Sequence, residues 1–131
     1  MHKPQEFYEK LAYLFYSVAG IDGKVDSIEI KKLHEEVISI WSQTDNDSHE
    51  FGTNGGVEIE AIFEWLEEEG YDSRDAWNDF KDYAKNNAYL FDQKMRNHIL
   101  HTCTEIASIY YHINKNEEEL INKLKSFLSK L

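Results

Sequence analysis

Three carboxylates surround a glycine turn near the start of the chain and are candidates for binding a divalent cation. Asp22, Asp26 and Glu29 lie within residues 19–29. If Glu29 is taken as the last ligand of a calcium loop, Asp22, Gly23 and Asp26 fall at suitable positions, but the two positions that supply the first carboxylates are occupied by other residue types. The alternative is structural: Gly23 makes a tight turn, and Asp26 and Glu29 cap the helix that follows.

A second group of potential ligands lies in a polar stretch, residues 42–56, which predicts a long loop. Asp45, Asp47, His49 and Glu50 combine carboxylate and imidazole groups, a mixture that suits a softer divalent ion such as zinc. A solvated acidic loop is the alternative. Because long loops inside a compact domain are often functional, we also expect this one to belong to a binding surface.

Acidic side chains also recur along the fourth predicted helix. Four aspartates follow one another at intervals of three or four residues and therefore share one side of that helix, opposite its apolar side: Asp72, Asp75, Asp79 and Asp82. This side is expected to face water. With residues 67–69, all glutamate, just upstream, it is also suited to docking a basic partner.

The fifth predicted helix carries the remaining reactive side chains. His98 and His101, with Glu105 one turn further, have the spacing of a zinc site but need a ligand from another element. Such histidines are more commonly surface groups without a metal. Cys103 falls on the apolar side, which predicts an inert core thiol. The sequence shows no arrangement typical of a nucleophile with its base, so we expect no enzymatic activity.

Apolar residues recur at helical spacing in about six segments and nowhere alternate as in a strand. The sequence therefore predicts an all-α fold, a compact bundle of about six helices forming a single domain over residues 1–131. The first helix is expected to end near Gly20 and the third at Gly70. The fourth is expected to start near Asp72 or Ser73 and to continue through Phe91. Tryptophan and tyrosine are expected to pack in the core and between helices.

A residue pattern near the start of the chain is repeated, less clearly, near its end. A shift of 88 positions (107 − 19) aligns Ala107 with Ala19, Ile113 with Val25 and Glu117 with Glu29. Two helix-turn-helix pairs of the same spacing are thus predicted. In the second pair Tyr110 and Tyr111 stand where the first has Asp22 and Gly23.

With these motifs the chain resembles the TerB-like domain family, known from bacterial tellurite-resistance operons and from the N-terminal part of DjlA-type co-chaperones. The matching residues are Ala19, residues 22–25 (Asp-Gly-Lys-Val) and Glu29, followed by the weaker second copy. The resemblance implies a compact, cytoplasmic helical bundle. It also implies a part in stress-related assemblies through protein contacts, and metal binding as a second role.

Composition narrows the choice of partner. Aspartate and glutamate number 25 against 14 lysine and arginine, which gives a formal net charge of −11 and disfavours nucleic acid and anionic membranes. A single cysteine suits a reducing cytosol, and neither a leader nor a membrane-spanning segment is recognisable. We therefore expect a cytoplasmic, non-catalytic interaction module that binds a basic protein. The alternative function is divalent-cation binding or sensing through Asp22, Asp26 and Glu29.

Overall fold

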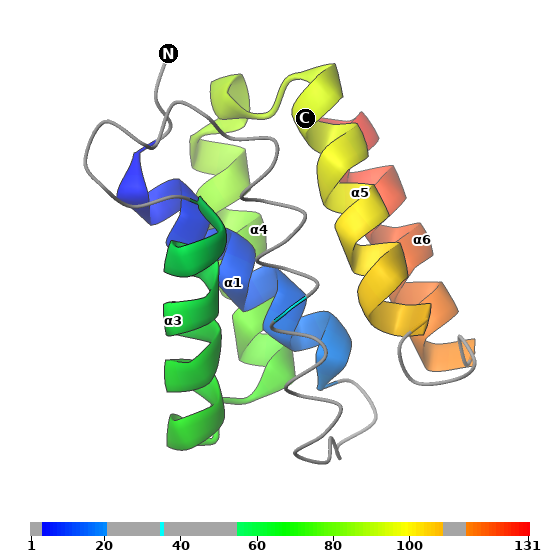
Figure 1. The fold of residues 1–131 in the computed structure, drawn as a ribbon. Coiled ribbons are helices and arrows are strands. Elements are labelled where there is room, and N and C mark those ends of the chain that lie inside the picture. Colours follow the sequence, from blue (N-terminus) through cyan, green and yellow to red (C-terminus); the bar gives the residue numbers. More distant parts are fainter. Residues whose placement is uncertain (1–3, 21–34, 36–54, 109–114) are drawn as a thin grey trace.

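The computed structural model describes residues 4–20, 35, 55–108 and 115–131. These residues form five α-helices, one short 3-10 helix and no strand, which confirms the predicted all-α bundle (Figure 1). The elements are α1 (Gln5–Ala19), α3 (Gly55–Glu69), α4 (Ser73–Asn86), η2 (Ala88–Leu90), α5 (Gln93–Ser108) and α6 (Lys115–Ser129). None of these helices is long and apolar enough to cross a bilayer. The predicted second helix lies outside the described residues except for Glu35, which is helical.

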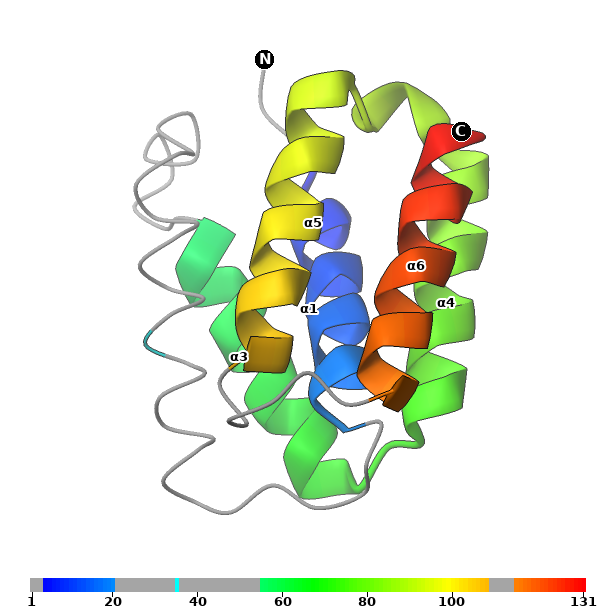
Figure 2. The same ribbon diagram turned by 90° about the vertical axis from the view of Figure 1, so that its right-hand side faces the viewer.

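The arrangement is centred on α1, which packs against α3, α4 and α5, while α6 packs against α5. In the view of Figure 2, α1 lies behind α5 and α6. A helix at the surface buries one stripe, whereas a helix at the centre is apolar nearly all round. α1 lies between these two patterns, because its buried residues form a broad stripe while Glu6, Glu9 and Lys10 share the remaining side. The buried residues are Phe7, Tyr8, Leu11, Ala12, Leu14, Phe15, Ser17, Val18 and Ala19.

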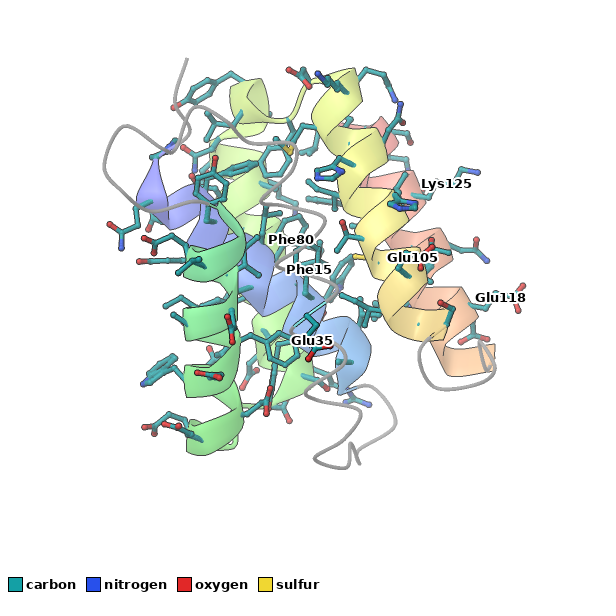
Figure 3. All side chains as sticks on the ribbon, viewed as in Figure 1. Phe15, Glu35, Phe80, Glu105, Glu118 and Lys125 are labelled. Atoms are coloured by element: carbon teal, nitrogen blue, oxygen red, sulfur yellow. The ribbon has the colours of Figure 1, made fainter. Side chains whose placement is uncertain are left out.

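A chain of aromatic rings connects α1 to the other half of the bundle. Phe7 lies 5.2 Å from Phe91, and Phe91 lies 6.0 Å from Phe80, measured between ring centroids. Phe80 in turn contacts Phe127 of α6 at 6.2 Å and Trp77 of α4 at the same distance. Phe15 and Phe80 point into the bundle, whereas Glu118 and Lys125 point outward from α6 (Figure 3). These contacts hold α4 and α6 together through side chains.

Two predicted helix ends were wrong. Gly55 and Gly56 belong to α3, not to the preceding loop. Glycine is among the residues favoured at the N-terminal end of a helix, so this pair does not prevent the first turn from forming. The fourth helix stops at Asn86 and does not reach Phe91, since the side chain of Asn87 donates to the carbonyl oxygen of Tyr83 at 2.9 Å and closes the end. Phe91 is nevertheless buried.

The connection from α3 to α4 is short and is held by backbone hydrogen bonds. The amide of Gly70 donates to the carbonyl of Glu67 at 3.1 Å, and the amide of Tyr71 donates to the carbonyl of Leu66 at 3.0 Å. This pair of bonds is the Schellman motif, which requires a residue in the left-handed conformation after the helix. Gly70 supplies it with φ of 64°, as the sequence predicted for a helix ending at this glycine.

Replacing Gly70 by Ala should lower the free energy of unfolding by about 1–2 kcal/mol, because a Cβ atom disfavours the left-handed conformation. No clash adds to this, since a Cβ at Gly70 would meet nothing within 4 Å. Gly70→Asn should be less destabilising, because asparagine adopts this conformation more readily. Urea unfolding followed by circular dichroism measures both variants, and equal losses for Ala and Asn would show that backbone conformation is not the cause.

Candidate functional site

Most of the predicted cation ligands lie outside the described residues: Asp22, Asp26, Glu29, Asp45, Asp47, His49 and Glu50. Cation binding at either group therefore stays a prediction. The capping role of Asp26 and Glu29 stays one as well. Across residues 4–20, 35, 55–108 and 115–131, no three side chains of histidine, cysteine, aspartate or glutamate gather in a way that could hold a metal ion.

The titratable side chains of α5 differ in how deeply they are buried. His98 is half-buried, and its pKa is lowered by that burial and, to a smaller extent, by the charges of His101 and Lys94. His101 is exposed. Cys103 is fully buried, and burial raises the pKa of its thiol far above the usual range. Because the thiolate is the reactive form, this environment agrees with the predicted inert core thiol.

Several carboxylates gather where the chain passes from α3 to α4. We call this region the acidic corner and define it by the residues Glu67, Glu68, Glu69, Asp72 and Asp75. All of them are exposed except Glu67, which is half-buried. The three-residue connection between the helices brings both groups of carboxylates to one end of the helix pair (Figure 1).

The two halves of the acidic corner differ in their relation to the helix dipoles. Asp72 caps α4, and its Oδ1 atom accepts hydrogen bonds from the amides of Arg74 at 2.8 Å and Asp75 at 3.2 Å. A carboxylate at a helix N-terminus is favourable. Residues 67–69, in contrast, place three glutamates at the negative C-terminal end of α3, and the last turn of that helix has no basic residue. This arrangement is locally unfavourable.

A group of tyrosines lies beneath the acidic corner and fixes it to α1. The hydroxyl of Tyr16 donates to the carbonyl oxygen of Tyr71 at 2.6 Å, and the hydroxyl of Tyr71 donates to the carboxylate of Asp79. The ring of Tyr13 meets that of Tyr71 edge-on at 5.5 Å. The turn, α1 and α4 are therefore linked through Tyr71, which the connection between the helices positions.

Burial, hydrogen bonding and nearby carboxylates all raise the pKa values of these tyrosines. The hydrogen bond to Asp79, followed by burial and by the charge of that carboxylate, raises the pKa of Tyr71 to about 12. Burial raises the pKa of Tyr13 and Tyr16, and nearby carboxylates raise it further, Asp79 acting on Tyr13 and Glu67 on Tyr16. All three hydroxyls are neutral donors at physiological pH.

The structure modifies two expectations about the burial of side chains. Three of the four aspartates predicted to face water are exposed, but Asp79 is half-buried and accepts the bond from Tyr71. The expectation that tryptophan and tyrosine pack inside is wrong for Trp65, which is 45% exposed, and for Tyr89, which is 78% exposed. The sequence did carry a signal for the bond between Tyr71 and Asp79. Tyr71 directly follows the glycine that ends α3, and a side chain at that position turns back onto the bundle.

Comparison of the chain with protein-family models finds no match, and comparisons with curated proteins and with solved structures find none either. The resemblance to TerB-like domains therefore stays a prediction from the sequence.

Raising the pH should destabilise the protein between about pH 10 and 12, in part through Tyr71. Its pKa is higher in the folded state than the ordinary value of 10.0, so the stabilisation is fully present below pH 10 and is lost as the pH rises through 12. Tyr83, whose pKa burial also raises to about 12, contributes to the same loss. Melting temperatures measured against pH should fall less steeply for Tyr71→Phe than for the natural chain, whereas identical slopes would contradict this role of Tyr71.

Proposed function

We propose that the protein is a cytoplasmic, non-catalytic interaction module and that its acidic corner docks a basic surface of another protein. The observation that carries the proposal is the set of glutamates at the negative end of α3, in a last turn without any basic residue. Such a local conflict with helix electrostatics destabilises the free protein, and conflicts of this kind concentrate at functional sites. A cationic partner relieves the conflict on binding.

The overall charge supports the same kind of partner. A net charge of −11 attracts basic proteins over long distances and repels nucleic acid and anionic lipid. The carboxylates of the acidic corner are mostly exposed, so the cations of a partner can reach them without a rearrangement of the bundle. Charges of this type act mainly on the rate of association and on the choice of partner.

We further propose that the module is TerB-like and serves a stress-response assembly. Two aligned pairs of the internal repeat lie within described helices: Val18 with Ile106 and Ala19 with Ala107. All four residues are buried, and both pairs stand at the C-terminal ends of their helices, α1 and α5. Equivalent burial at equivalent positions is what a repeated helix-turn-helix pair requires, and this supports the family assignment.

Neutralising the acidic corner should weaken capture of a basic partner without affecting the fold. The test compares the double variant Glu68→Gln/Glu69→Gln with Glu118→Gln/Glu119→Gln on α6, which removes the same charge from two adjacent, exposed glutamates. Immobilised protein is used to capture partners from cell extract at increasing salt. Partners held by these charges should be released as salt rises, because the Debye length shortens from about 10 Å at 0.1 M to about 3 Å at 1 M. The first variant should fail to capture the same partners, because it lacks two of the charges.

The second variant should retain those partners. Both variants should melt within a few degrees of the natural chain, because exposed charges contribute little to stability. Equal loss of partners in the two variants would indicate a general charge effect and would refute a role specific to the acidic corner.

A further inference from the structure

The outward face of α3 carries a line of exposed apolar side chains. Val57 and Trp65 are each 45% exposed, and Ala61 between them is exposed as well. Residues four apart lie one above the other on a helix, so the three side chains form one line. At a rise of about 1.5 Å per residue, the line from Val57 to Trp65 is roughly 12 Å long.

The opposite face of α3 already supplies its share of the core. Ile59, Phe63 and Leu66 are buried, and α3 packs against α1. In Figure 1, α3 forms one edge of the bundle, on the other side of α1 from α5 and α6. Val57, Ala61 and Trp65 thus lie on the outer side of this edge helix. Single exposed apolar residues are ordinary, but an aligned set of them marks an interaction surface.

The charge around this line selects its occupant. α3 contains six glutamates and no lysine or arginine: Glu58, Glu60, Glu64, Glu67, Glu68 and Glu69. Glu58 stands beside the start of the line, and Glu68 follows Trp65 by three residues, which places it on the same side of the helix. If a second copy of this chain packed here, its six carboxylates would face those of the first copy and repel them. An anionic membrane would be repelled as well.

We propose that the line Val57–Ala61–Trp65 is the docking site for a basic amphipathic helix of a partner protein, with Trp65 as its apolar anchor. This inference rests on the proposed interaction function and adds the form of the partner. Helix pairs pack along rows of residues spaced by three or four, and a helix of about three turns with apolar residues at that spacing matches the line. Its lysine and arginine side chains meet Glu68 and Glu69 at the end of α3.

Two synthetic peptides of identical composition test the proposal on the full chain. The first is a helix-forming peptide of about 14 residues with leucines four apart and lysines elsewhere; the second has the same residues in scrambled order. Affinities are measured by fluorescence anisotropy of labelled peptide at low salt. The patterned peptide should bind about tenfold more tightly than the scrambled one, because only it presents an apolar row to Trp65.

Two variants of α3 and one control make the assignment specific. Trp65→Ala and Ala61→Lys should each weaken the patterned peptide about tenfold or more, the first by removing the anchor and the second by placing a cation in the line. Lysine is a good helix former, so Ala61→Lys keeps α3 helical. Tyr89→Ala removes a more exposed aromatic ring from η2 and should leave binding unchanged. Melting curves verify that each variant folds.

The outcomes separate this inference from the proposed function. Equal binding of the two peptides, unaffected by Trp65→Ala and Ala61→Lys but weakened by Glu68→Gln/Glu69→Gln, would refute the apolar line and leave the acidic corner in place. Failure of both cationic peptides to bind at low salt would refute the acidic corner together with the line.

Discussion

The burial of a broad side of α1 is the constraint on which the rest of the bundle depends. Nine of the fifteen residues of this helix are buried, so several other elements have to cover it at once. α3, α4 and α5 each cover one side, and α6 is held to α5 and to the aromatic rings of α4. Each covering helix is then free to present its outer side to water or to another molecule.

The acidic corner shows how the covering helices acquire such an outer side. Tyr16 reaches from α1 to the backbone of Tyr71, and Tyr71 reaches Asp79 on α4, so the turn between the two helices is tied to the centre of the bundle. The backbone that carries these carboxylates is held by the hydrogen bonds from the amides of Gly70, Tyr71 and Arg74. A charged surface on a rigid support loses little conformational entropy when a partner binds.

Periodicity and end signals in the sequence were sufficient for the fold class and for most helix limits in the described residues. The glycine that ends α3 at Gly70 and the start of α4 next to Asp72 follow from local signals, and both were predicted correctly. The end of α4 was not, because the hydrogen bond from Asn87 that closes it competes with an apolar pattern that continues to Phe91. The bond between Tyr71 and Asp79 and the exposure of Trp65 depend on how helices pack against one another, which spacing along one helix does not encode.

Because Cys103 is buried, the reaction of its thiol with a reagent reports opening of the bundle. The sequence contains one cysteine, and its side chain is fully enclosed on the inner face of α5. A thiol reagent in solution can therefore react only with molecules in which that helix has opened, and one label per chain counts each such event. The rate of labelling, followed as reagent concentration rises, measures how often the native bundle opens around α5 under conditions where spectroscopy sees only the folded state.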